Sequence, residues 1–493
     1  MKRKARSGWG GPASGCGQVR KMKIKTAASA ILATFVFAFA ACGAARAQAR
    51  RSIEQILNDP VLKQSTVALM AKDLRTGQTL INLNADRKMI PASNMKLVTG
   101  AAAMLELGPG FKFHTDFMLK NFNPSTGLSD GVYIKGYGDP SISDRFYASA
   151  GEAMDAHAAQ LRKNGFKGFA GVLWLDGSFM DNMRPASWPQ EDLSWCYAPR
   201  PGALSAAGNC ARVTVSAGAS TAKATIDPPL HPSFFRVSLK ATTGNTSVKV
   251  SQDEKGVITV SGSVKKNTSA KYEHTVRKPT LLYGAALLGA MKRAGMKVSA
   301  DMRETSDLPP GYSGFARAVS PDLAAVTAQM EKHSDNFIAE QIVRTLGGLK
   351  GASDAPGAAA VVKDIMVRAN MAAASDLTVV DGSGLSRENR LAPKVLLTLL
   401  SSFYNFNPGR PFQDMLAEPG VKGTLEKRLV KTSAAGRLKA KTGALRGACS
   451  LSGYIRPVYG GSVAFVMIMN GYSVHSNQIR ALQDELVLAL VEM

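Results

Sequence analysis

Three serines in this chain of 493 residues are followed three positions later by a lysine, a spacing that can pair a nucleophile with its base. A serine hydroxyl is a weak nucleophile until a base removes its proton, and a neutral lysine within reach can do so. Spacing alone does not choose among the matches, because a chain of this length contains such matches by chance. The three pairs are Ser93 with Lys96, Ser220 with Lys223, and Ser263 with Lys266.

The local context separates these pairs. Ser93 lies in PASNMKLVTG, residues 91–100, where a proline favours a helix start and helix-forming residues follow. Residues three apart on a helix share a face, so Lys96 can reach Ser93. Ser220 and Ser263 lie in alternating, glycine-punctuated stretches that predict strands, where residues three apart point to opposite faces. Ser93 is therefore the candidate nucleophile.

Two further motifs follow Ser93 along the chain. Residues 333–336, HSDN, contain the only Ser-x-Asn, and residues 441–443 are the only Lys-Thr-Gly. The first lies in a predicted helical region and the second in a predicted strand. In this order, the three motifs are similar to the set found in penicillin-binding proteins and class A β-lactamases.

Each residue of the three motifs can take a specific chemical role. Lys96 acts as the base only when it is neutral, and burial together with a second cation, Lys441, would lower its pKa. Ser334 can relay a proton to a leaving amine, and Asn336 can hold Lys96 and a substrate amide.

The third motif suits the binding of a peptide end. Lys441 and Thr442 can bind a C-terminal carboxylate, and Gly443 lets the substrate lie along the strand edge as an added strand. The backbone N–H groups of Ser93 and Ala444 would form an oxyanion hole.

The elements that must position these residues follow from the sequence pattern. Two strands around an RTGQ turn precede the helix at Pro91, and three strands and a helix close the chain. Between them, residues 111–274 read mostly as strand and loop, and helical periodicity returns at 277–299 and 321–347. This order predicts an α+β fold, an antiparallel sheet covered by helices, interrupted by a large β-rich insertion.

Longer stretches carry a family resemblance. From about residue 55 to the end, the chain resembles the D-alanyl-D-alanine carboxypeptidase/endopeptidase group of low-molecular-weight, class C penicillin-binding proteins. The resemblance implies a penicillin-binding-protein/β-lactamase-like transpeptidase domain in two parts, 50–110 and 276–493, with two nested β-rich domains inserted at 111–275. The stretches are PASNMKLVTGAAAMLELG, GYGDPSIS, LDGSF, HSDNFIAEQI, DGSGLSR, GTLEKRL and KTGALRGACSLSGYI.

The resemblance also implies an activity. It implies cleavage of the terminal D-Ala–D-Ala bond of peptidoglycan stem peptides, and of D-alanyl cross-links, through an acyl-enzyme on Ser93. β-Lactam antibiotics such as penicillin should acylate the same serine, and no cofactor is implied. Ala444 stands where relatives often have serine or threonine, so the substrate preference is less defined than the reaction.

Two other functions stay open. A serine β-lactamase would need a group that activates water for deacylation, and no ExxLN-like segment follows Asn336. A non-catalytic wall-binding or penicillin-sensing protein could use the same fold, although every motif residue is present. DGSGLSR, with Asp381, Ser383 and Arg387, could edge the cleft or form an ordinary turn, and His333 is expected to pack beside Ser334.

The N-terminal region reads as a leader. A basic stretch at residues 20–25 precedes an apolar run at 26–41, and small residues at 45–49 fit signal-peptidase sites. We expect a signal peptide over residues 1–49, cleaved near 47–49, and a periplasmic protein. An uncleaved anchor is the alternative, and translation could start at Met1 or Met22.

The charge of the remaining chain bears on its partners. The formal net charge is +24, and residues 1–50 carry ten basic and no acidic residues, which leaves 51 basic against 37 acidic residues, or +14. This suits anionic cell-wall polymers and allows a peripheral membrane contact. Nucleic acid is not expected, because the basic residues are scattered.

Cysteine and histidine spacing bears on disulfides and metals. Cys196 and Cys210 could pair in an oxidising compartment, and Cys449 lies in an apolar strand pattern typical of a buried thiol. The six histidines are scattered without a metal-ligand spacing, so no metal site is predicted.

Overall fold

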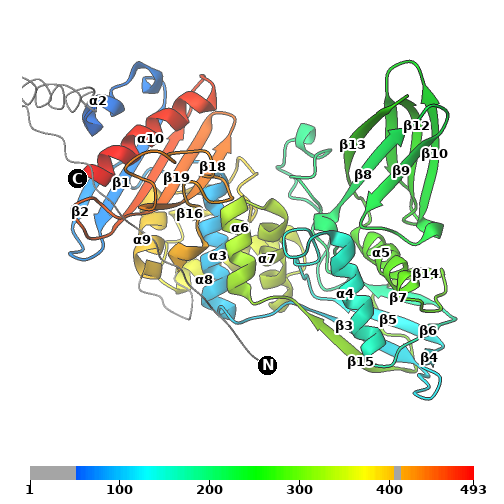
Figure 1. Ribbon diagram of the computed structural model, residues 1–493. Coiled ribbons are helices and arrows are strands. Elements are labelled where there is room, and N and C mark those ends of the chain that lie inside the picture. Colours follow the sequence, from blue (N-terminus) through cyan, green and yellow to red (C-terminus); the bar gives the residue numbers. More distant parts are fainter. Residues whose placement is uncertain (1–50, 405–411) are drawn as a thin grey trace, which may run out of the picture. The chain divides into compact units, whose positions relative to one another are not determined.

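A computed structural model describes residues 51–404 and 412–493. Its first sheet has five antiparallel strands in the order β18-β19-β20-β1-β2 (Figure 1). The strands are β1 (Thr66–Asp73), β2 (Thr79–Leu83), β18 (Leu438–Leu445), β19 (Ala448–Ile455) and β20 (Val463–Asn470).

Helices cover both faces of this sheet, because successive side chains of a strand point to opposite faces. Val67 and Leu69 of β1 pack into one cluster with α2 (Ile53–Leu57) and α10 (Ser476–Glu492), which lies across the sheet in Figure 1. Ala68 and Met70 pack into the opposite cluster. The helices on that side are α3 (Met95–Leu107), α6 (Leu323–His333), α7 (Asn336–Leu349), α8 (Ala355–Arg368) and α9 (Pro393–Tyr404).

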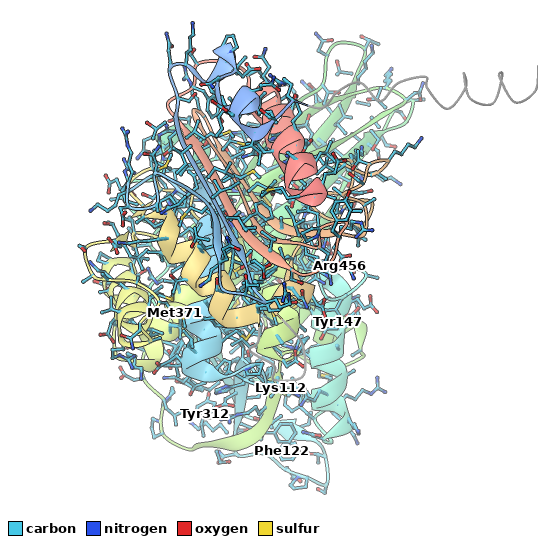
Figure 2. All side chains as sticks on the ribbon, turned by 90° about the vertical axis from the view of Figure 1, so that its left-hand side faces the viewer. Lys112, Phe122, Tyr147, Tyr312, Met371 and Arg456 are labelled. Carbon is cyan, nitrogen blue, oxygen red and sulfur yellow. A yellow bond between two sulfur atoms is a disulfide. The ribbon has the colours of Figure 1, made fainter. Side chains whose placement is uncertain are left out.

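A second sheet of five strands lies in the inserted part, in the order β14-β7-β5-β3-β15. Helices α4 (Ala150–Lys163) and α5 (Pro279–Arg293) share its apolar core. In Figure 2, Phe122 and Tyr312 mark this part, and Arg456 marks the end of β19 in the first sheet. The strands are β3 (His114–Lys120), β5 (Gly131–Gly136), β7 (Leu173–Asp176), β14 (Met302–Thr305) and β15 (Tyr312–Val319).

Six more strands lie between β7 and α5 in the chain. They form two sheets of three strands, in the orders β13-β8-β9 and β10-β12-β11. The strands are β8 (Cys210–Ala217), β9 (Ala222–Asp227), β10 (Phe235–Thr242), β11 (Ser247–Gln252), β12 (Ile258–Lys265) and β13 (Thr268–Thr275).

The sheet pairing shifts one predicted boundary. β14 and β15 follow α5 in the chain but pair with β7 and β3, so the inserted sheet is completed only at Val319. The predicted boundary between residues 275 and 276 is therefore too early, and the helices of the first part resume with α6. Helical periodicity reveals which face of α5 is apolar, but not which core that face joins.

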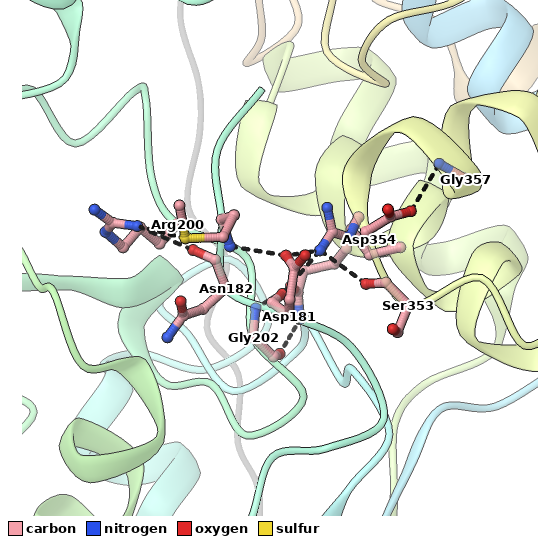
Figure 3. A network of polar contacts seen from close by, with 10 residues as sticks. Asp181, Asn182, Arg200, Gly202, Ser353, Asp354 and Gly357 are labelled. Carbon is pink, nitrogen blue, oxygen red and sulfur yellow. Dashed lines mark hydrogen bonds and ion pairs between the residues drawn. The ribbon is translucent and has the colours of Figure 1, made fainter. Parts of the chain in front are cut away.

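A buried polar network connects the inserted part to α7 and to the segment between α7 and α8. Arg344 of α7 is 1% exposed and donates through Nη2 to the carbonyl oxygens of Asp181 and Ser353, at 3.0 and 2.9 Å. It also pairs with the carboxylate of Asp181. Figure 3 shows Asp181, from the segment after β7, beside Ser353 of the α7–α8 connection.

The structure decides the cysteine pairing that the sequence left open and confirms the buried thiol. Cys196 and Cys210 form a disulfide, and Cys449 is a buried free thiol in β19. The predicted leader, residues 1–49, lies outside the described residues. Within residues 51–404 and 412–493, no helix has both the length and the apolar character needed to cross a bilayer.

Candidate active site

Ser93 lies in a short 3-10 turn, Ala92–Asn94, directly before α3. Ala92, just before it, has a φ of 47°, a left-handed conformation that is strained for a residue with a side chain. The neighbouring strand β19 holds the turn: Ser450 Oγ donates to the Pro91 carbonyl at 2.7 Å, and Asn94 Nδ2 donates to Ser452 Oγ at 2.6 Å. These contacts hold the turn that carries Ser93 against β19.

Lys96 is fully buried in the first turn of α3. Its Nζ donates to Ser93 Oγ at 3.2 Å, to Asn336 Oδ1 at 2.7 Å and to the Ser383 carbonyl at 2.6 Å. Burial lowers its pKa to about 8, although Glu331, Asp381 and other acids oppose the shift. The predicted contribution of a second cation is not among the main causes at Lys96, where burial dominates.

Ser334 lies at a break between two helices that the sequence pattern had run together. It ends α6 with a φ of 55°, and Asp335 then caps α7 by accepting the Ile338 N–H at 3.1 Å. Asn336, the first residue of α7, donates through Nδ2 to the Tyr197 carbonyl at 2.7 Å. The break turns both motif side chains toward the same cleft.

Lys441 lies on β18, the edge strand of the first sheet, and is fully buried. Its Nζ donates to Ser334 Oγ and to the Thr442 carbonyl, each at 2.8 Å. Burial lowers its pKa to about 7, with the charge of Lys96 as a further cause. Lys441 thus contacts Ser334 from beneath the cleft, and its contact with a substrate carboxylate stays a prediction.

The outer edge of β18 points toward the cleft. Ala440 exchanges both backbone hydrogen bonds with Ala417 on that edge, at 2.9 and 3.2 Å. Because backbone groups alternate sides along a strand, the N–H groups of Thr442 and Ala444 also point outward. The Ala444 N–H, which is predicted to form an oxyanion hole with the Ser93 N–H, therefore points away from β19.

Gly443 is needed for close packing. A Cβ at this position would lie 2.2 Å from Ser450 Oγ, 3.0 Å from the Ser93 nitrogen and 3.1 Å from the Pro91 carbonyl. The structure thus shows that β18 approaches the turn around Ser93 too closely for a side chain at this position. Access of substrate to the strand edge, the other expected reason for this glycine, stays a prediction.

A cavity of about 680 Å³ opens over these residues. It has four of the predicted site residues in its lining, while Lys96 and Lys441 lie buried beneath. The segment after Trp188, from the inserted part, forms one wall. The lining residues are Ser93, Pro189, Glu191, Asp192, Tyr197, Ser334, Asn336, Gly384, Leu385, Arg387, Ala444, Leu445 and Arg446.

The DGSGLSR segment belongs to the site, which settles an alternative left open by the sequence. The Ser383 carbonyl accepts from Lys96, and Arg387 lines the cleft. The carboxylate of Asp381 is buried and accepts the N–H groups of Gly384 and Ser386, at 2.7 and 2.6 Å. Trp188 Nε1 donates to the same carboxylate at 2.8 Å.

The two remaining Ser-x-x-Lys pairs lie elsewhere. Ser263 lies in β12 between Lys240 and Ser247, as expected for a strand residue. Ser220 lies in the turn between β8 and β9, and not in a strand as predicted. Neither lines the cleft.

Comparison with known proteins agrees with this arrangement. The profile of the D-Ala-D-Ala carboxypeptidase 3 (S13) family matches residues 49–492. A D-alanyl-D-alanine carboxypeptidase of Actinomadura sp. (strain R39) is 28% identical over 473 residues, covering 92% of this chain and 86% of the relative. D-alanyl-D-alanine carboxypeptidase DacB of Haemophilus influenzae is 27% identical over 424 residues, covering 83% and 86%.

The fold also matches a solved structure. The crystal structure of penicillin binding protein 4 from H. influenzae superposes with a TM-score of 0.73 at 24% identity, covering 89% of this chain and 99% of that one. The predicted fold class and the resemblance drawn from the motifs are thereby confirmed. The chain belongs to the D-Ala-D-Ala carboxypeptidase 3 (S13) family of peptidases.

Proposed function

We propose that this peptidase hydrolyses the terminal D-Ala–D-Ala bond of peptidoglycan stem peptides, and D-alanyl cross-links, through an acyl-enzyme on Ser93. One observation carries the proposal: two buried lysines hydrogen-bond to two different serines that line the same cavity. Such an arrangement supplies a nucleophile with a base and a second hydroxyl with a proton source. β-Lactams would acylate Ser93 in the same way.

Acylation begins at Lys96. Its lowered pKa leaves a neutral fraction near neutral pH, which accepts the Ser93 proton as the oxygen attacks the carbonyl carbon. The backbone N–H groups of Ser93 and Ala444 stabilise the oxyanion, each by about 3 kcal/mol if they match measured cases.

Departure of the leaving group uses the second serine. Ser334 gives its proton to the amine of the departing D-alanine and takes one from Lys441, to which it is already hydrogen-bonded. Asn336 keeps Lys96 in place. Water then attacks the ester and gives its proton through Ser334 to the now neutral Lys441, while Lys96 returns its proton to the Ser93 oxygen as the peptide is released.

The substrate would bind along the free edge of β18 as an added strand. Lys441 supplies positive charge beneath that edge for the terminal carboxylate, and Thr442 supplies a hydroxyl. The cleft also presents Arg387 and Arg446 together with Glu191 and Asp192, which suits a peptide that carries both charges. Periplasmic action on the cell wall accords with the predicted leader.

The test uses protein that lacks residues 1–49. We expect release of D-alanine from a pentapeptide stem and labelling by fluorescent penicillin, with both lost in Ser93→Ala and kept in Ser220→Ala. A label retained by Ser93→Ala but lost from Ser220→Ala would contradict the assignment. Mass spectrometry of digested muropeptides separates carboxypeptidase from endopeptidase action.

Two outcomes of the same assay would favour other functions. Rapid penicillin turnover without a lasting adduct would favour a β-lactamase. Neither label nor product from the unmodified chain would favour a non-catalytic wall-binding protein.

A further inference from the structure

The carboxyl group of Glu331 lies buried behind the cleft without a hydrogen-bond partner. The side chain is 0% exposed, and within the described part of the chain neither of its oxygens is hydrogen-bonded. Buried charges in proteins are normally paired. Glu331 also lies in the last turn of α6, where the helix dipole disfavours an acid. Glu331, one helical turn before Ser334, therefore departs both from the pairing of buried charges and from the preference for cations at a helix C-terminus.

The neighbouring helix leaves room for this carboxylate. Gly100 of α3 lies four residues after Lys96, hence on the same helix face. A Cβ at Gly100 would lie 3.2 Å from Glu331 Oε1 and 3.0 Å from Thr327 Cγ2. Glycine inside a helix costs about 1 kcal/mol relative to alanine, so this space is kept at the expense of stability.

The cations facing Glu331 are the two lysines of the site. Lys96 comes from α3 and Lys441 from β18, and the Glu331 charge raises the pKa of both. Burial raises the pKa of Glu331 to about 7, opposed by the charges of the two lysines. Three ionisable groups without exposed surface therefore titrate together near neutral pH.

The other acids near Lys96 differ from Glu331. Glu340 accepts the Ser383 N–H at 2.8 Å, Asp381 accepts the Gly384 N–H, and Asp335 caps α7. Each has a structural partner, and each raises the pKa of Lys96 but not that of Lys441. Glu331 is the acid that acts on both.

We propose that Glu331 is a positioning residue whose negative charge makes the Lys96–Lys441 pair hold one proton. The inference rests on the proposed acyl-enzyme mechanism, which starts with Lys96 neutral and Lys441 charged. Because the pKa values are about 8 and about 7, this is the less populated of the two singly protonated forms of the pair. Without the carboxylate, burial and mutual repulsion would favour the neutral form of both lysines. Ser334 would then have no proton to pass on.

The proton count of acylation fits a fixed counter-charge. The Ser93 proton moves to Lys96, while a proton from Lys441 passes through Ser334 to the departing amine. The pair holds one proton before and after the step, so Glu331 faces the same net charge throughout. Above its own pKa of about 7, the Glu331 carboxylate stabilises the transfer without rearranging.

The experiment compares pH profiles of acylation by fluorescent penicillin for the wild-type chain and Glu331→Gln. The wild-type profile should be bell-shaped, with the acid limb from Lys96 and the alkaline limb from Lys441. In Glu331→Gln both limbs should move to lower pH by roughly one unit, since a neighbouring charge has been removed. At pH 8 the rate should fall roughly tenfold.

Three variants act as controls. Glu331→Asp keeps the charge and should keep both limbs close to wild type. Glu340→Gln should move the acid limb alone, because Glu340 acts on Lys96. Glu331→Met, a second neutral variant, should reproduce the double shift if Glu331→Gln folds poorly.

The inference would be overturned if the limbs of the pH profile of Glu331→Gln or Glu331→Met coincide with those of wild type. It would also be overturned if they move to higher pH. The proposed function would be left standing if Ser93→Ala still abolished the label. Failure of the wild-type chain to label at any pH would overturn the proposed function itself.

Discussion

The two parts of the molecule differ in how their buried charges are grouped. Beneath the cleft, in the part built on the first sheet, five ionisable side chains are buried together: Lys96, Lys441, Glu331, Glu340 and Asp381. The inserted part buries single carboxylates, such as Asp176, which pairs with Lys135, and other pairs such as Arg293–Asp155 lie at its surface. Burying charge generally costs stability, so its concentration at the cleft marks where protons move.

The inserted part nevertheless contributes to the site. Trp188 donates to Asp381, and the Tyr197 carbonyl accepts from Asn336. Both residues belong to the wall segment, residues 188–198, which the Cys196–Cys210 disulfide ties to β8. The part built on the first sheet therefore carries the reacting side chains, and the inserted part helps to position them.

The largest expected effect comes from removing a buried cation. Lys96→Met should lower the acylation rate about a thousandfold, because Ser93 loses its base. Stability should also fall, by about 3 kcal/mol, since the buried oxygens of Asn336 and Ser383 lose a donor and the surrounding acids lose a cation. Penicillin labelling and thermal melting measure the two effects. Labelling at the wild-type rate would mean that another group is the base.

Removal of the disulfide should have the next largest effect, a loss of stability of the inserted part. A loop of about 15 residues implies a loss of about 3 kcal/mol in Cys196→Ala/Cys210→Ala. KM for a pentapeptide should rise, because Tyr197 and its neighbours line the cleft. Urea unfolding and steady-state kinetics measure this, and reduction of the wild-type chain is the matched control. Unchanged KM would show that the wall stands without the disulfide.

A smaller effect is expected at the contact between the two parts. Trp188→Phe removes one of several donors to the Asp381 carboxylate, which should cost about 1–2 kcal/mol of stability. Acylation should slow about tenfold if that energy is expressed at the site, because Asp381 orders the segment whose Ser383 carbonyl holds Lys96. Trp174→Phe, also in the inserted part, should leave the rate unchanged. Equal slowing in both variants would contradict a specific role.

The smallest effect should follow from a surface charge. Arg293→Met removes an ion pair between α5 and α4 and should change stability by less than about 1 kcal/mol, with unchanged acylation. A loss as large as that of the disulfide variant would remove the contrast between the two parts.

Much of the fold and site follows from local patterns. The strands around the RTGQ turn, the helix after Pro91 and the three closing strands each carry their own periodicity, and the structure contains them all. The pairing of Ser93 with Lys96 is also local, since it depends only on spacing along one helix start. Outside the motifs, the alternation of Ser450 and Ser452 indicated a polar face of the strand. The sequence did not indicate which segment that face contacts.

The sequence by itself determined the reactive groups and their elements, because side-chain type and periodicity are properties of short segments. Only the tertiary structure decided that α5 joins the inserted core, that the Ser383 carbonyl holds Lys96, and that Glu331 faces both lysines. A backbone carbonyl has no signature in residue type, and the bond from Lys96 to Asn336 spans 240 residues. Such contacts depend on how distant segments pack, which no local pattern records.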